Sequence, residues 1–505
     1  MLGAVWIYVF VSLIAGLAAV LMQDAWQVLK RVLRRDLPPG PRGFPLLGYL
    51  PFMFKAGHLE VDSLRKKYGN IFGLHLGSRY VVFLCDRDSM AEAFSHNALL
   101  LRPVEFPLSL NPEESVITLN GPIWQRHRHF FVKMLKKLGA GTPVMEAHIQ
   151  KELSHLLREL NARNGDPLAP HAVLTGSVSN IMTMVLASRR FGQDHPQRAR
   201  INDFIDVVAV HSSQVLAINF FPSLRSVFSC LGLGSCGRLR KAFLRRTRII
   251  TQLMSENART YQEGTVRNFS DGFISEMKNG QEGNETFTRD MLIGDVGSLI
   301  GGGTGTTRTA LEWLMVMSAA HPSQQSLVTA ETDAVMKEKE PGSRITWSDR
   351  LKMPYAQAFI WETLRCKPVN PLSPMRCASD HINLGGYFIP RGSIVIPAFW
   401  SLFNDPSLWK DPELFCPERF LTDSGHLVTK PKWFIPFSSG KRSCPAESVA
   451  SMVVFVYFTN ILHQFTIEIS TSGVHPNDEV PGLTVRPKSH ELVFKPREYY
   501  PGHKM

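Results

Sequence analysis

Residues 437–446 read Phe-Ser-Ser-Gly-Lys-Arg-Ser-Cys-Pro-Ala, and a strongly apolar stretch follows from Ala446 to Phe465. The apolar stretch predicts a buried helix, which places Cys444 at its N-terminus. Free backbone N–H groups and the helix dipole favour a thiolate at such a position. Pro445 suits the first helical position, where no N–H is needed, and Gly440 allows a tight turn. The stretch predicts a thiolate in a tight loop; a buried, inert cysteine is the alternative.

The remaining cysteines do not form a framework. The chain has 505 residues and seven cysteines, with no CxxC pair. An odd, scattered set argues against structural disulfides, and the lack of paired ligands argues against zinc. The net charge of +12 is compatible with an anionic membrane or an acidic partner. Because no basic block with interleaved aromatics occurs, no nucleic-acid partner is expected.

The N-terminus predicts a membrane anchor. Leu2–Met22 carries no charge and is long enough to cross a bilayer. The basic residues come after it, at 30, 31, 34 and 35, which places the bulk of the chain in the cytosol. We expect an uncleaved transmembrane helix at 1–22, a basic, proline-rich linker at 23–45 and one catalytic domain at 46–505. A cleaved signal peptide is the alternative.

The rest of the chain predicts a mainly α fold with small β-sheets. Spaced apolar residues indicate helices at 61–68, 89–95, 124–138 and 143–164, and short β-like runs occur at 71–75, 80–84, 382–384 and 393–397. Residues 291–320 are apolar but contain charges and many glycines, so we expect a buried central helix. Residues 400–440 are rich in Pro, Asp, Asn and Gly and are expected to be irregular.

Further spaced elements accompany the cysteine loop. Glu362 and Arg365 stand three residues apart, which allows them to pair on one helix face. Arg419 lies downstream in Pro417–Phe420, and a buried carboxylate needs such partners. Trp124 and Arg128 bracket a WxxxR element.

Together these elements resemble the cytochrome P450 family. Residues 437–446 match its FxxGxRxCx(G/A) signature at every defined position, and the anchor, proline hinge, WxxxR, Gly/Thr helix, ExxR, PERF and cysteine loop follow the family order. The resemblance implies the P450 fold and haem b, with Cys444 as the axial ligand of the iron. It also implies that Glu362, Arg365 and Arg419 form a structural ion triad.

The resemblance assigns further residues to the haem. Phe437 would cover the sulfur and Gly440 would turn the loop beside the porphyrin. The haem propionates would be held by arginines and a tryptophan, which are Trp124, Arg128, Arg376, Arg442 and, more faintly, Arg102. Walls of the substrate pocket are expected at Val116, Leu299 and Leu483.

The Gly/Thr helix departs from the family pattern. Relatives typically read (A/G)Gx(D/E)T, and Gly302, Gly303 and Thr306 match, but Gly305 occupies the acidic position. The glycines would let the helix open near the iron, and the Thr306 hydroxyl would relay a proton. Without the acid, three readings stay open: hydroxylation with protons from elsewhere, rearrangement of an oxygenated substrate without a reductase, or non-catalytic binding of haem and lipid.

The first reading is our expectation. The chain would insert one oxygen atom from O2 into a lipophilic steroid, fatty acid or xenobiotic, with electrons from NADPH through NADPH-cytochrome P450 reductase and with cytochrome b5 as a further partner. It would be a single-pass protein of the endoplasmic reticulum membrane. Basic side chains around the thiolate side would dock the reductase, namely Arg126, Lys133, Lys136, Lys137, Lys441 and Arg442.

Overall fold

The computed structural model describes residues 36–497 except 54–55, 104–113, 222–230, 233, 280–285, 471–476, 483 and 489–490, together with scattered positions between 11 and 26. The side chains of 213–219 are also outside the description. The predicted anchor therefore lies largely outside the described residues, and Leu483 lies outside them altogether. Within the part described, no helix is both long enough and apolar enough to cross a membrane.

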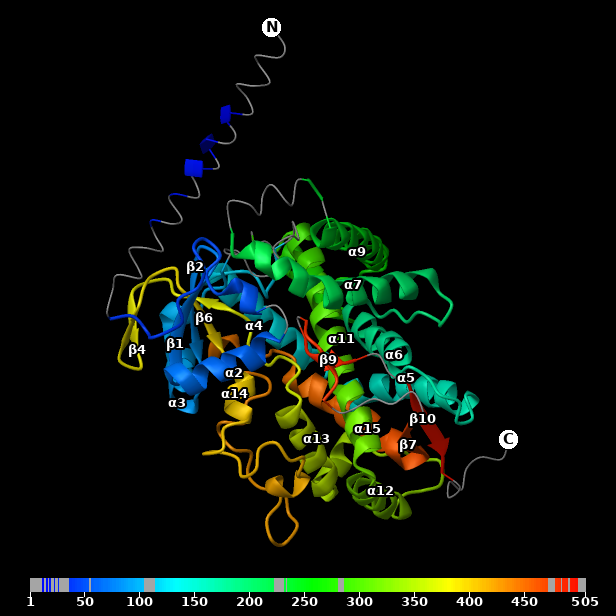
Figure 1. The fold of residues 1–505 in the computed structure, drawn as a ribbon. Helices are drawn as coiled ribbons and strands as arrows, with labels where there is room; N and C mark the ends of the chain where they lie inside the picture. The colour runs from blue at the N-terminus through cyan, green and yellow to red at the C-terminus, as the bar shows by residue number, and fades with distance from the viewer. Residues whose placement is uncertain are drawn as a thin grey trace.

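Most of the described chain is helical, which confirms the mainly α prediction (Figure 1). The α-helices are α2 (Gly57–Tyr68), α3 (Arg87–Ser95), α4 (Gly121–Lys137), α5 (Pro143–Ala162), α6 (Pro170–Ala187), α7 (Pro196–Asn219), α9 (Gly234–Arg259), α10 (Phe269–Lys278), α11 (Arg289–Ala320), α12 (Pro322–Lys337), α13 (Pro354–Cys366), α14 (Phe399–Phe403) and α15 (Glu447–Gln464). Short 3₁₀ turns are η1 (Leu50–Met53), η2 (Asn97–Leu99), η4 (Trp347–Lys352), η5 (Pro417–Phe420) and η6 (Gly440–Arg442).

The β-structure is small, and its largest sheet lies to one side of the helices (Figure 1). A four-stranded sheet has the order β1-β2-β6-β3, with β1 (Ile71–Leu76), β2 (Arg79–Leu84), β6 (Ile394–Pro397) and β3 (Arg376–Cys377). Three two-stranded pairs complete it: β4 (Ile382–Leu384) with β5 (Tyr387–Ile389), β7 (Phe465–Ile469) with β10 (Leu492–Pro496), and β8 (Glu479–Val480) with β9 (Arg486–Pro487).

The four-stranded sheet is buried on both faces. Along β2, Val81 and Phe83 join the cluster that includes Val61 of α2, whereas Val82 and Leu84 join the main helical core. This division follows from the two-residue period of a strand, which sends successive side chains to opposite faces. The sheet therefore docks rigidly against the helices.

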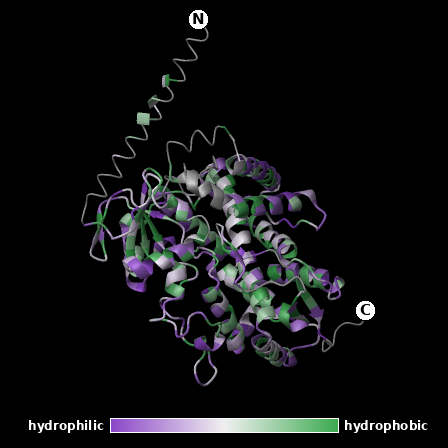
Figure 2. Ribbon diagram, in the orientation of Figure 1, coloured by the Kyte–Doolittle hydropathy of each residue, from purple (hydrophilic) through white to green (hydrophobic). Residues whose placement is uncertain are grey.

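Helix α11 runs through the middle of the helical part and packs against α6, α9, α13 and α15 (Figure 1). Thr288 caps its N-terminus by accepting a hydrogen bond from the Met291 N–H at 3.2 Å. Its C-terminus lies just before Pro322, the first residue of α12. Figure 2 shows hydrophobic residues concentrated on α15, which packs against α11. Together α11 and α15 position the two walls of the functional site.

Candidate functional site

The cysteine loop is held in a tight turn by its own backbone. The Cys444 N–H donates to the Phe437 carbonyl at 2.9 Å, and the Ser443 N–H donates to the Gly440 carbonyl at 3.0 Å. Gly440 has φ +72°, and a Cβ atom there would lie 2.6 Å from the Phe94 backbone oxygen. Glycine is needed at this position for both its conformation and its size.

The helix after the loop begins later than the sequence predicts. Its first residue is Glu447 and its N-cap is Ala446, so Pro445 precedes the helix and does not occupy its first position. Burial raises the pKa of the Cys444 thiol, while a hydrogen bond from the Ala446 N–H and the charge of Arg128 act in the opposite direction. An end-of-helix N–H therefore stabilises the sulfur anion even though the proline lies outside the helix.

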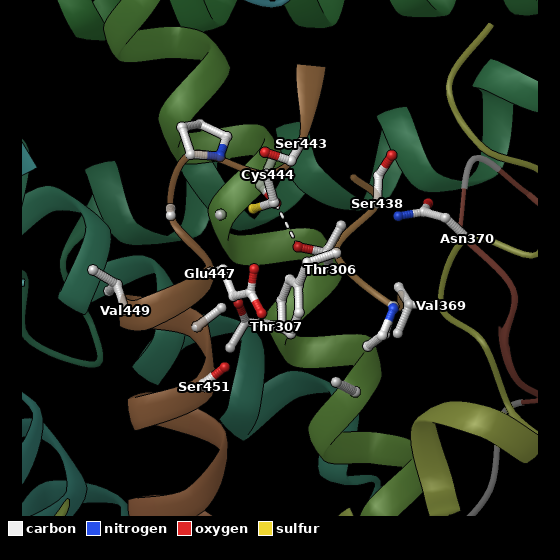
Figure 3. Close-up of a pocket in the computed structure, with 18 of the residues that line it drawn as sticks. Thr306, Thr307, Val369, Asn370, Ser438, Ser443, Cys444, Glu447, Val449 and Ser451 are labelled. Atoms are coloured by element: carbon white, nitrogen blue, oxygen red, sulfur yellow. Dashed lines mark hydrogen bonds between the residues drawn. The ribbon is translucent and has the colours of Figure 1, made fainter. Parts of the chain in front are cut away.

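A cavity of about 400 Å³ separates Cys444 from α11. Figure 3 shows Cys444, from the loop that precedes α15, and Thr306, from α11, beside the same space. The predicted wall residues Val116 and Leu299 line it, as does Phe437. The site thus has a sulfur on one side and a hydroxyl-bearing helix on the other.

The glycines of α11 have different surroundings. Gly302 and Gly303 both line the cavity, and a Cβ on Gly303 would lie 2.5 Å from the Met182 sulfur, so this glycine serves close packing. A Cβ on Gly305 would meet nothing nearer than 4.0 Å. The Thr306 hydroxyl donates to the Gly302 carbonyl at 2.7 Å and borders the cavity. The position without its acid therefore has room for a Cβ atom.

Four arginines meet at one end of the cavity: Arg102, Arg128, Arg376 and Arg442. Burial lowers the pKa of Arg376 to about 10, and burial followed by repulsion from Arg376 and Arg128 lowers the pKa of Arg442 to about 9. The pKa of Arg102 is lowered by burial and by the other three charges. Among the described residues, no carboxylate forms an ion pair with Arg128, Arg376 or Arg442. This end of the cavity is built for an anion.

Arg442 also ties the loop to neighbouring segments. It donates to the carbonyls of Leu100 at 2.8 Å and Leu119 at 2.7 Å and to the Asn120 side chain at 3.0 Å, and it stacks on the Trp124 ring at 3.8 Å. Because Arg442 is buried, its predicted place among exposed docking charges is wrong. The other basic residues assigned to docking, at 126, 133, 136, 137 and 441, are exposed.

The residues present fit a haem. The Arg376 Nε is buried and makes no hydrogen bond to any described residue, which leaves a donor that a haem propionate would satisfy. The neighbouring arginines supply the charge that two propionates would neutralise, and the Cys444 sulfur would serve as the thiolate ligand. Arg128 reaches the loop as well, because it donates to the Ser443 hydroxyl at 3.3 Å.

The predicted ion triad comes together behind the loop. Arg365 donates to the Glu362 carboxylate at 2.7 and 2.8 Å, and Arg419 donates to it at 3.0 Å. The Cys416 N–H adds a fourth hydrogen bond at 2.9 Å. Arg365 also donates to the Phe403 carbonyl at 2.8 Å, so the triad holds the irregular chain after α14.

Comparisons with known proteins agree with this architecture. The cytochrome P450 family model matches residues 38–494. The chain belongs to the cytochrome P450 family. It is 31% identical to rat cytochrome P450 2U1 over 495 residues, covering 92% of this chain and 91% of that protein. Human cytochrome P450 2J2 is 30% identical over 501 residues, with 96% of each chain covered, and cytochrome P450 18a1 of Drosophila melanogaster is 28% identical. P450 membership means that the chain is a haem b monooxygenase.

Sequence reasoning missed a buried clamp of this P450. Asp295 of α11 is buried and accepts hydrogen bonds from the Val116 N–H at 2.7 Å and from His127 at 3.2 Å. The clamp fixes the pocket segment around Val116 against the central helix. The signal was an acidic residue in an apolar part of the helix, and its partners lie more than 160 residues away.

The segment before β3 forms another wall of the cavity, through Val369, Asn370, Ser373 and Pro374. Helix α6 contributes Met182 and its neighbours, which no motif indicated.

Proposed function

We propose that this P450 hydroxylates a lipophilic small molecule at the endoplasmic reticulum membrane, with electrons from NADPH delivered by a flavin reductase. The observation that carries the proposal is the largely apolar cavity that lies between the Cys444 sulfur and the Gly/Thr segment of α11 (Figure 3). Haem held by Cys444 and the arginines would supply the activation of dioxygen.

Thr306 would hold and pass the proton that this chemistry needs. Its hydroxyl now donates to the Gly302 carbonyl, one helical turn earlier, and rotation about χ1 would turn it toward the cavity. Because Gly305 carries no acid, the proton would reach Thr306 through water in the cavity or through the substrate. The apolar walls would exclude other water and protect the reaction from side paths.

A matched pair of threonines tests this role. Thr306 and Thr309 both donate to the carbonyl four residues before them, at 2.7 and 2.9 Å, but Thr306 lines the cavity and Thr309 does not. Thr306→Ala should raise the peroxide released per NADPH consumed, whereas Thr309→Ala should leave this ratio near that of the wild type. Equal ratios in the two variants would contradict the proton role.

The first experiment on the proposed function is the spectrum of the reduced, carbon-monoxide-bound protein. A Soret band far to the red, typical of thiolate-ligated haem, is expected, and Cys444→Ser should abolish it. Product that forms only with NADPH, O2 and added reductase supports hydroxylation. Product without reductase would instead indicate rearrangement of an oxygenated substrate, and binding without product would indicate a haem and lipid binder.

The exposed lysines of α4 would receive the reductase. Lys133 and Lys137 are exposed on this helix, and complementary charge mainly accelerates encounter. Reversing both charges should raise the apparent KM for reductase, while reversing the exposed Lys337 of α12 should not. An unchanged KM in the double variant would refute docking at α4.

Anchoring by residues 1–22 and a linker at 23–45 complete the proposal. Deletion of residues 1–22 should release the chain from microsomes at alkaline pH, and retention of the truncated chain would show that other residues bind the membrane.

A further inference from the structure

The segment between α13 and β3 forms a rigid wall of the cavity. The Val369 carbonyl accepts a hydrogen bond from the Val485 N–H at 2.9 Å, and the Pro371 carbonyl accepts one from the Trp400 N–H at 3.0 Å. Two residues on, the Ser373 N–H donates to the Pro397 carbonyl at 2.8 Å. The backbone is therefore held on both sides of Asn370, which lies between these anchored positions.

Asn370 brings an unpaired amide to this wall. It lines the cavity, and its side chain makes no hydrogen bond to any described residue. Figure 3 shows its amide at the edge of the space that Thr306 and Val369 border. The amide offers both N–H donors and a carbonyl acceptor, whereas the Thr306 hydroxyl already donates to its own helix.

The charged residues that line the cavity have other partners. Arg102, Arg128, Arg376 and Arg442 form the anion-binding end, and Lys430 pairs with Glu447 at 3.3 Å. Among the described lining residues, no further charged side chain is left to pair with a substrate. The cavity as a whole is largely apolar.

We infer that Asn370 is a specificity-determining residue that selects neutral lipophilic substrates bearing a hydroxyl or carbonyl group. The inference rests on the proposed function and narrows its substrate class: a neutral alcohol or ketone fits, and an ionised fatty acid does not. A bound hydroxyl or carbonyl group pairs with the amide, while a purely apolar ligand leaves the amide desolvated and unpaired. The anchored backbone lowers the entropy lost when the hydrogen bond forms.

Three probes of one ring size separate these contributions: 2-naphthol, naphthalene and 2-naphthoate. Dissociation constants are measured by equilibrium dialysis with the purified haem-loaded protein, which requires no turnover. The wild type should bind 2-naphthol roughly 10-fold more tightly than naphthalene, because a paired amide replaces an unpaired one. It should also bind 2-naphthol more tightly than 2-naphthoate.

In the Asn370→Leu variant, naphthalene should bind more tightly and 2-naphthol more weakly than in the wild type. The ratio of the two dissociation constants should therefore fall to about one. Val369→Ala is the matched control, because it changes the adjacent apolar wall and should leave the ratio unchanged. A wild-type ratio near one, an equal ratio in wild type and Asn370→Leu, or no binding of 2-naphthol to the wild type would overturn the inference. The carbon-monoxide spectrum of the same samples shows separately whether the proposed haem-thiolate function holds.

Discussion

Glu362→Gln removes a negative charge from a fully buried cluster and keeps the shape of the side chain. One carboxylate oxygen accepts hydrogen bonds from Arg365, Arg419 and the Cys416 N–H, and the other accepts from the Arg365 Nε at 2.7 Å. In the glutamine variant an amide NH2 group must replace one of these oxygens. If this NH2 group faced the Arg365 Nε, two hydrogen-bond donors would oppose each other and no acceptor would lie between them.

The expected loss in free energy of unfolding follows from the charge that Arg365 retains in the variant. Arg365 is fully buried and would keep its positive charge without the carboxylate that neutralises it. Breaking a buried ion pair by removing one partner costs about 3–5 kcal/mol. Arg419 is partly exposed and can be rehydrated, so Arg419→Gln should cost less than Glu362→Gln.

The assay is urea unfolding of the haem-loaded protein, followed by circular dichroism and by loss of the Soret band. Glu338→Gln is the matched control, because Glu338 pairs with Lys352 at 2.6 Å on the surface. Its unfolding midpoint should stay at the wild-type value, since exposed pairs are solvated in both states. Similar midpoints for Glu362→Gln, Glu338→Gln and the wild type would refute the burial argument, and Arg419→Gln retains a readout if Glu362→Gln does not fold.

Three other predictions concern single positions. Gly440→Ala should destabilise the protein by about 2 kcal/mol and lower haem occupancy, because its φ is positive; an unchanged melting temperature would contradict this. Gly305→Glu should fold normally and raise NADPH-dependent turnover at least about 10-fold if proton supply is limiting; a steady rate would assign that supply to another group. His171 bridges Asp206 and Glu312, which raises the pKa of His171 from 6.5 to about 9. Its contribution to stability is about 1–2 kcal/mol after allowance for its exposure, is fully present below pH 6.5 and is lost as pH rises through 9. The unfolding midpoint of His171→Gln should therefore depend less on pH over this range than that of the wild type.

Local signals carried much of the architecture. The 3.6-residue period located helices such as α4 and α5, and the period of two located β1 and β2, because these repeats depend on backbone geometry alone. The start of α15 was less predictable. Proline at 445 is compatible with a first helical position or with a preceding turn, and the loop that contains Cys444 decides between them.

Charge was harder to read than periodicity. The sequence predicts both Lys133 and Arg442 as docking residues on the thiolate side. In the structure Lys133 is exposed, whereas Arg442 is buried against the Trp124 ring. The family signature assigns Arg442 to a haem propionate, but the charge pattern used for docking does not separate it from Lys133, because burial depends on segments far away along the chain. The same limitation hid the Asp295 clamp.

The sequence by itself determined the family, the thiolate candidate Cys444 and the need for glycine at 440, because these depend on side-chain chemistry and on spacing within a few residues. The tertiary structure alone decided that Asp295, Val116 and His127 converge, and that the Asn370 amide lines the cavity with no hydrogen-bond partner among the described residues. Such convergence arises from the packing of distant elements around α11, and no local pattern encodes which side chains that packing leaves unpaired.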